Sequence, residues 1–103
     1  MLAHDVGRVI NPVGARGQVE GGVVQGIGYA LTEQLKTDAR GRIVNGSLHD
    51  YRIPTIADVP PTIETVFVET NQSLSGPFGA KGLGEPPVII PAAAIGSAVR
   101  DLL

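Results

Sequence analysis

One long segment of the chain repeats its apolar positions at helical spacing. In residues 18–36, apolar side chains recur every four residues, at Val19, Val23, Ile27 and Leu31. Polar residues and glycines stand between them. A period of three to four residues is typical of a helix that buries one face. The pattern therefore predicts a helix over 18–36.

The same predicted helix is rich in glycine, which stands at positions 21, 22, 26 and 28. Each glycine costs about 1 kcal/mol relative to Ala in an exposed helix. Gly22, Gly26 and Ala30 recur every four residues and form one smooth stripe. We expect this stripe to lie close to another backbone or to a flat ligand, because missing side chains permit such an approach.

Shorter elements are expected on both sides of this helix. Residues 4–17 are turn-rich, since an Asn-Pro pair and three glycines interrupt them. Residues 37–46 predict a β-hairpin that turns at Gly41. The β-branched residues in 63–69 predict a strand.

The end of the chain predicts a second helix. Residues 91–103 are mostly apolar and good helix formers, and Pro91 would stand in the first turn. The predicted fold class is α+β, with two main helices, a β-hairpin and one or two further short strands. Long loops join these elements.

Composition and charge exclude several classes of function. No Lys/Arg cluster offsets the net charge of −2, which argues against a nucleic-acid partner. The longest apolar run is too short and too interrupted for a membrane span. The absence of Cys excludes disulfides, thiolate metal sites and a cysteine nucleophile. No targeting signal is present, so we expect a cytoplasmic location and leave the periplasm open.

The segment GPFGAKGLGEPP, residues 76–87, holds the main candidate for chemistry. Lys81 is followed by Gly82 where a phosphate-binding loop needs Ser or Thr, so the segment does not predict nucleotide binding. Glu85 stands between Gly84 and a Pro-Pro pair that fixes the direction of the chain. A carboxylate held on such a turn is suited to accept a proton. An ordinary solvated loop glutamate fits the same pattern.

Other polar residues are weaker candidates. Gln18, at the start of the predicted helix, could pair its side-chain amide with a ring of alternating donors and acceptors, or it could simply be a first-turn residue. The adjacent residues His4 and Asp5, like His49 and Asp50, face opposite sides of an extended segment. Neither pair has a third ligand nearby, so we expect structural or solvent-facing roles and no metal site.

Four segments, taken in order, point to one family. They are HDVGRVINP, GQVEGGVVQGIGYALTE, YRIPTIADVPP and GPFGAKGLGEPP. In this order and at these spacings they resemble the molybdenum hydroxylases, the family of xanthine dehydrogenase and aldehyde oxidase. The match is to the C-terminal molybdopterin-binding part of the large subunit. It runs through essentially the whole chain.

The resemblance implies a reaction and a role for each matching residue. Members hydroxylate an aldehyde or a purine-like N-heterocycle with oxygen from water. Glu85 would be the base that deprotonates a Mo–OH group, and Gln18 would hydrogen-bond the pterin. Lys81, Gly82 and Gly84 would form a loop close to the molybdenum–molybdopterin cofactor, mainly through their backbone. Iron–sulfur clusters, with or without FAD, in other domains or subunits would carry the electrons away.

The chain is shorter than this chemistry requires. The family's other cofactor-binding segments, its substrate-pocket residues and its cluster-ligating cysteines are absent. We therefore expect residues 1–103 to be a partial C-terminal molybdopterin-binding domain, truncated at both ends and inactive in isolation. Its partners would be the remainder of the large subunit or other subunits, and a small-molecule substrate. The alternative is a non-catalytic accessory or interaction domain that has kept only the fold.

Overall fold

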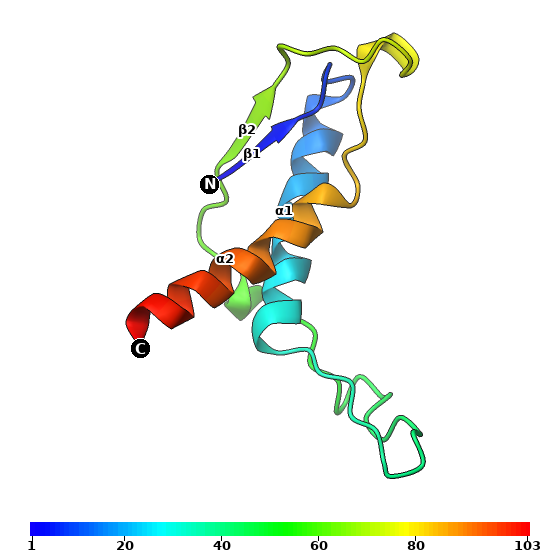
Figure 1. Cartoon of the computed structure of the whole chain (residues 1–103), viewed down its shortest axis with the longest axis vertical. Helices are drawn as coiled ribbons and strands as arrows, with labels where there is room; N and C mark the ends of the chain where they lie inside the picture. The colour runs from blue at the N-terminus through cyan, green and yellow to red at the C-terminus, as the bar shows by residue number, and fades with distance from the viewer.

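The computed structural model describes all 103 residues and contains two long helices and a small sheet. The elements in chain order are β1 (Leu2–Asp5), α1 (Pro12–Leu31), a 3₁₀ turn (Ile56–Asp58), β2 (Thr65–Val68), a second 3₁₀ turn (Pro77–Gly79) and α2 (Pro86–Leu102). The sheet lies beside the first half of α1, and α2 crosses α1 near its middle (Figure 1). The predicted α+β class is confirmed.

Strands β1 and β2 pair in parallel, from Leu2 opposite Thr65 to Asp5 opposite Val68. Parallel strands need a long crossover connection, and α1 lies within it. The strand predicted over 63–69 is confirmed in its central part.

Helix α1 starts at Pro12 and ends at Leu31, so the bounds predicted as 18–36 are wrong at both ends. The Asn-Pro pair that we expected to interrupt the chain starts the helix instead. Asn11 Oδ1 accepts a hydrogen bond from the Gly14 N–H at 3.0 Å. Pro12 occupies the first turn, where backbone N–H groups have no partner within the helix, so the N–H that proline lacks costs no hydrogen bond.

Helix α2 also starts earlier than predicted, at Pro86 rather than at residue 91. Pro86 and Pro87 occupy its first positions, where proline is tolerated. Pro91 lies inside the helix and is buried. The second helix is therefore confirmed and its predicted start is wrong, because the first of three candidate prolines begins the helix.

The glycine stripe of α1 packs against α2. A Cβ added to Gly22 would lie 2.6 Å from Pro87 Cβ, and one added to Gly26 would lie 2.8 Å from Pro91 Cβ. All four residues are buried. Of the two partners that the sequence left open for this stripe, the structure shows a neighbouring helix.

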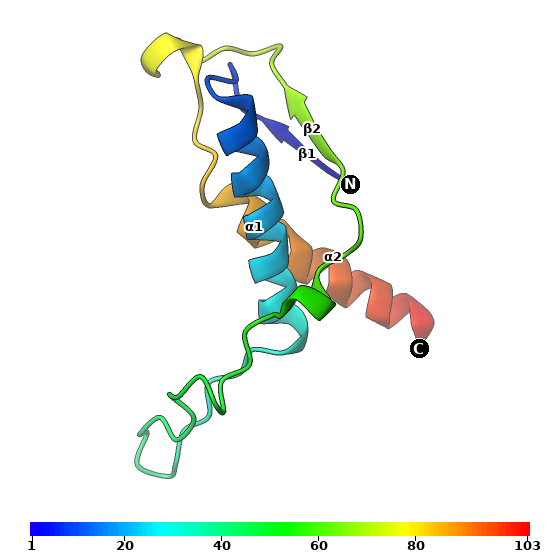
Figure 2. The same cartoon turned by 180° about the vertical axis from the view of Figure 1, so that it is seen from behind.

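Residues 33–55 form an arm that extends away from the crossed helices (Figure 2). The hairpin predicted over 37–46 is reduced to a single antiparallel bridge between Thr37 and Ile43. The turn does form at Gly41, which has a φ of 76°. No ladder extends from it, because two strands without a sheet or helix to pack on are marginally stable at best.

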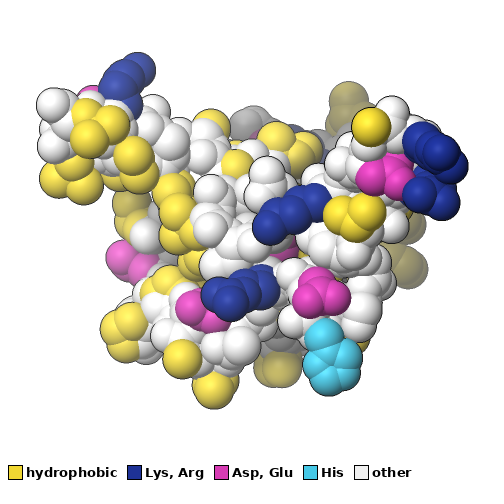
Figure 3. Space-filling view, turned by 90° about the horizontal axis from the view of Figure 1, so that it is seen from below, with side chains coloured by type: hydrophobic (Ala, Val, Ile, Leu, Met, Phe, Trp, Pro, Cys, Tyr) yellow, Lys and Arg dark blue, Asp and Glu magenta, His cyan; other side chains and the backbone are white.

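The buried core is small for a chain of this length. Only 11 of 103 residues are buried, and the apolar side chains among them are Leu2, Val6, Ala15 and Val19, together with the prolines Pro87 and Pro91 of α2. The radius of gyration is 16.7 Å, whereas a compact domain of this size has about 13 Å. Apolar side chains lie among charged ones on the face drawn in Figure 3. No helix is long and apolar enough to cross a membrane.

Candidate active site

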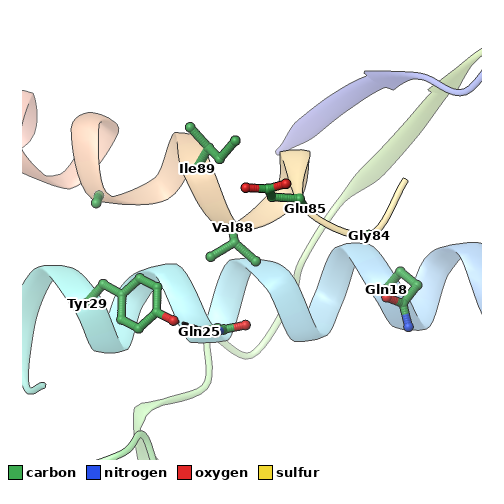
Figure 4. A pocket seen from close by; sticks show the side chains of 8 residues that line it. Gln18, Gln25, Tyr29, Gly84, Glu85, Val88 and Ile89 are labelled. Carbon is green, nitrogen blue, oxygen red and sulfur yellow. Dashed lines mark hydrogen bonds between the residues drawn. The ribbon is translucent and has the colours of Figure 1, made fainter. Parts of the chain in front are cut away.

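Glu85 and Gln18 are far apart in the sequence but line the same groove (Figure 4). The groove has a volume of about 690 Å³ and runs between α1 and the start of α2. Its lining residues are Gln18, Gln25, Tyr29, Gly84, Glu85, Val88, Ile89 and Ala92. The helix crossing creates this arrangement: Pro87 rests on Gly22, which fixes Glu85, two residues earlier, over α1.

Glu85 stands immediately before α2, and its side chain is exposed. Its carboxylate caps no backbone N–H of the helix. The start of a helix favours a negative charge, because the helix dipole is positive there. Val88 lines the groove with Glu85, whereas Leu83 lines a different cavity. The Glu85 carboxylate is therefore free to contact a bound molecule.

Gln18 lies in the second turn of α1, since that helix begins at Pro12. The alternative that Gln18 is a first-turn residue is therefore wrong. Its side chain is exposed and lines the groove. The side-chain amide can donate and accept hydrogen bonds at the same time.

Gly82 and Gly84 leave the backbone before α2 uncovered. Both residues are exposed, and a Cβ added to either would meet no atom within 4 Å. Neither residue has a positive φ, so neither backbone conformation nor internal packing requires glycine at these positions. The bare backbone is accessible to a ligand from outside the chain.

Lys81 is directed toward β1 and does not line the groove of Glu85. Its Nζ donates to Asp5 Oδ2 at 2.6 Å, and its backbone N–H donates to the Val6 carbonyl at 2.9 Å. His4 Nε2 lies 3.0 Å from the Gly82 carbonyl oxygen. The adjacent residues His4 and Asp5 thus have a structural role, in holding the loop before α2.

The pKa of the Asp5 carboxyl is lowered by this contact. The hydrogen bond from the Lys81 ammonium is the main cause, and a hydrogen bond from the Gly7 N–H adds to it. Both donors favour the charged form of Asp5. Asp5 is therefore a carboxylate at neutral pH, paired with Lys81.

Gln25 and Tyr29 are groove residues that the sequence analysis did not identify. Gln25 Nε2 donates to the Tyr29 hydroxyl oxygen at 2.6 Å (Figure 4). Positions 18, 25 and 29 fall on one side of a helix. That spacing is the signal by which these two residues could have been found.

The structure contains no group of three or more His, Cys, Asp or Glu side chains that could hold a metal ion. His49 and Asp50 are exposed in the arm. His4 and Asp5 are engaged with the loop at residues 81 and 82.

Comparison with known proteins gives consistent matches along the chain. Residues 1–60 match the family of the molybdopterin cofactor-binding domain. The xanthine dehydrogenase molybdenum-binding subunit of Escherichia coli O157:H7 is 49% identical over 98 residues, which are 94% of this chain and 13% of that protein. The nicotine 6-hydroxylase large subunit of Paenarthrobacter nicotinovorans is 44% identical over 100 residues, which are 97% of this chain and 12% of that protein.

A solved structure shows the same arrangement of elements. Quinoline 2-oxidoreductase from Pseudomonas putida 86 matches with a TM-score of 0.87 and 42% identity, over 96% of this chain and 12% of that chain. The chain thus spans about an eighth of the length of its relatives. The resemblance drawn from the four sequence segments is confirmed. The relatives of this chain include molybdenum-binding subunits of the xanthine dehydrogenase and aldehyde oxidase type. The chain belongs to the molybdopterin cofactor-binding domain family.

Proposed function

We propose that this chain supplies a proton acceptor and pterin contacts to the active site of a molybdopterin-dependent oxidoreductase. The reaction is the hydroxylation of an aldehyde or an N-heterocycle with oxygen from water. The observation that carries the proposal is that Glu85 and Gln18 share one groove. Relatives named nicotine 6-hydroxylase, quinoline 2-oxidoreductase and aldehyde oxidoreductase support these two substrate classes.

The groove and the glycine-containing loop before α2 fit one edge of the cofactor. The Gln18 amide offers a donor and an acceptor, as a pterin ring requires. At Gly82 and Gly84 no side chain stands between the backbone and a planar ligand. When bound, the molybdenum cofactor supplies the redox chemistry and activates water. Iron–sulfur clusters and FAD belong to other domains or subunits in this proposal.

Glu85 acts as the general base. It would accept the proton of the water-derived oxygen as that oxygen replaces a hydrogen on the substrate carbon, while that hydrogen would pass to the bound cofactor with the two electrons of the broken C–H bond. The exposed carboxylate has no capping hydrogen bond to give up first. Val88, Ile89 and Ala92 line the groove beside it and make that wall apolar. A positioned base contributes typically about 10²–10⁴-fold to the rate.

The shape of the molecule favours a part of an enzyme over a free-standing accessory domain. An accessory domain needs its own core, whereas only 11 of 103 residues are buried here. Residues 1–103 therefore work as part of a C-terminal molybdopterin-binding domain, together with the remainder of a large subunit or other subunits. The isolated chain is inactive.

The base assignment is tested in the enzyme that contains this chain. Glu85→Gln keeps the size of the side chain and removes its ability to take up a proton. Molybdenum and pterin content should stay at the wild-type level, while kcat falls by at least about 10²-fold. Glu64→Gln, at an exposed position before β2, is the matched control. Near-normal turnover by Glu85→Gln would show that another group is the base.

A further inference from the structure

The loop that leads to Glu85 is fastened to the end of β1. The Lys81 ammonium pairs with Asp5 at 2.6 Å, and the Lys81 N–H donates to the Val6 carbonyl at 2.9 Å. One residue further, the Gly82 carbonyl oxygen lies 3.0 Å from His4 Nε2. Strand and loop are thus joined at two successive loop residues, through both backbone and side chains.

The turn after β1 is shaped to receive this loop. Gly7 has a φ of 65° and is buried, and a Cβ at this position would overlap the Gly79 carbonyl oxygen. Its N–H donates to Asp5 Oδ1 at 3.0 Å. The two carboxylate oxygens of Asp5 are therefore shared between Gly7 and Lys81. This one side chain connects strand, turn and loop.

Glu85 lies between two fixed points. On one side the loop is held at Lys81 and Gly82, and on the other Pro87 is held against Gly22. Between these points, Gly82 and Gly84 have no side chain, and a Cβ added to either would contact no other atom. Few residues separate the two points, and each residue can span at most about 3.5 Å. Holding the loop at Lys81 and Gly82 therefore limits the positions that Glu85 can take.

We propose that Asp5 and His4 are positioning residues that set the Glu85 carboxylate over the groove, and that Lys81 acts through Asp5 rather than by contacting the cofactor. This inference rests on the proposed role of Glu85. It assigns a task to the adjacent His and Asp of β1, and it gives Lys81 a different task from the one that the family resemblance implied.

The size of the two effects separates positioning from simple stabilisation. About a third of each side chain in the Lys81–Asp5 pair is exposed, at 35% and 37%. Such a pair contributes little to overall stability, because water screens it. Misplacing a catalytic group by about 1 Å can cost about 10²-fold in rate. Breaking the pair should therefore lower kcat clearly while it changes the free energy of unfolding only slightly.

The test uses the cofactor-loaded enzyme that contains this chain, with the variants Asp5→Asn, Lys81→Met and their combination. Asn keeps an acceptor for the Gly7 N–H and loses the charge that holds Lys81. Each single variant should lower kcat about tenfold or more, with molybdenum content and the substrate KM unchanged. The double variant should be no slower than the slower single variant, because both remove one interaction. Lys81→Arg should restore most of the activity.

A second anchor and a matched control complete the experiment. His4→Leu should lower kcat in the same way, whereas His4→Gln, which can still donate to the Gly82 carbonyl, should not. Arg42→Met breaks an exposed ion pair of similar length, 2.8 Å to Asp38, in the arm. It should leave kcat unchanged.

Three results would overturn the inference. Lys81→Met could lose pterin while Asp5→Asn keeps it, which would mean that Lys81 contacts the cofactor directly. The losses of kcat in Asp5→Asn and Lys81→Met could multiply in the double variant, which would mean that the two residues act independently. Both single variants could also be as fast as wild type. Glu85→Gln is measured in parallel: if that variant stays active, the proposed function itself fails. If it is inactive while the Asp5 and Lys81 variants are fully active, only the positioning role is refuted.

Discussion

The Asp5 carboxylate uses both of its oxygens, one for the Lys81 ammonium and one for the Gly7 N–H. Both contacts favour the charged form and lower the pKa of this group. The carboxyl therefore has a lower pKa when the loop is docked than when it is free. At pH values above the pKa of the free loop, such a group stabilises the docked loop. This contribution is lost as the pH falls through the lower pKa of the docked loop.

This difference predicts an acid-dependent opening of the loop at residues 79–84. Above about pH 4, the usual range for Asp, wild type should protect the loop amides from hydrogen exchange better than Asp5→Asn does. Below it the advantage should shrink, because wild-type Asp5 becomes protonated. Exchange followed by mass spectrometry in the assembled enzyme, with both proteins at the same pH, measures this. An advantage that is independent of pH would mean that the Asp5 charge does not hold the loop.

The residues of the site were predicted unevenly, for a physical reason. Glu85 was indicated by its local setting, between a glycine and two prolines. Its neighbour in space, Gln18, was only a weaker candidate from its place in the predicted helix, and its pterin-binding role came from the family resemblance. The partner of Lys81 was missed, because Asp5 lies 76 residues away in the sequence. No local pattern reports a contact between the first strand and a distant loop.

At the scale of elements, the types of the helices were predictable and their starts were not. An Asn-Pro pair is compatible with a turn and equally with a helix cap followed by a first-turn proline. In α2, three prolines could each begin the helix. The helix begins at Pro86, and this start places both Pro87 and Pro91 inside the helix and against α1. Tertiary packing therefore decides what local sequence leaves open.

The cap of α1 gives a prediction for one side chain. Asn11→Ala removes the acceptor for the Gly14 N–H and should cost about 0.5–2 kcal/mol of local stability. Asn11→Asp keeps an acceptor oxygen and should behave like wild type. Hydrogen exchange of the first turn of α1 measures both variants. Equal protection in Asn11→Ala and wild type would show that the proline alone defines the helix start.

The crossing of the helices predicts opposite effects for two adjacent glycines. Gly22→Ala places a methyl group 2.6 Å from Pro87 Cβ, and overpacking of this kind costs typically about 1–3 kcal/mol. A Cβ on Gly21 meets nothing within 4 Å, so Gly21→Ala should gain up to about 1 kcal/mol from helix propensity. Hydrogen exchange across α1 and α2 compares the two. A Gly22→Ala variant as well protected as Gly21→Ala would argue against the close crossing.

At the scale of the whole molecule, the chain cannot cover its own apolar surface. Among the large apolar side chains, Ile56 is 89% exposed and Leu48 is 77% exposed. A parallel sheet is normally covered on both faces and contains more than two strands. The sequence predicted the two helices and the loop-rich character, but not this openness. Hydrophobic periodicity shows which face of a helix is apolar, not what covers it.

The openness predicts how the isolated chain behaves. Exposed apolar surface without a sufficient core favours association or unfolding over a compact monomer. In size-exclusion chromatography the isolated chain should elute as aggregate or as an expanded species, and it should bind no molybdenum and oxidise neither aldehyde nor purine. The same residues within the enzyme that contains them are the control. A compact monomer with a cooperative unfolding transition would instead favour the accessory domain, because such a chain would stabilise its fold without covering from other parts.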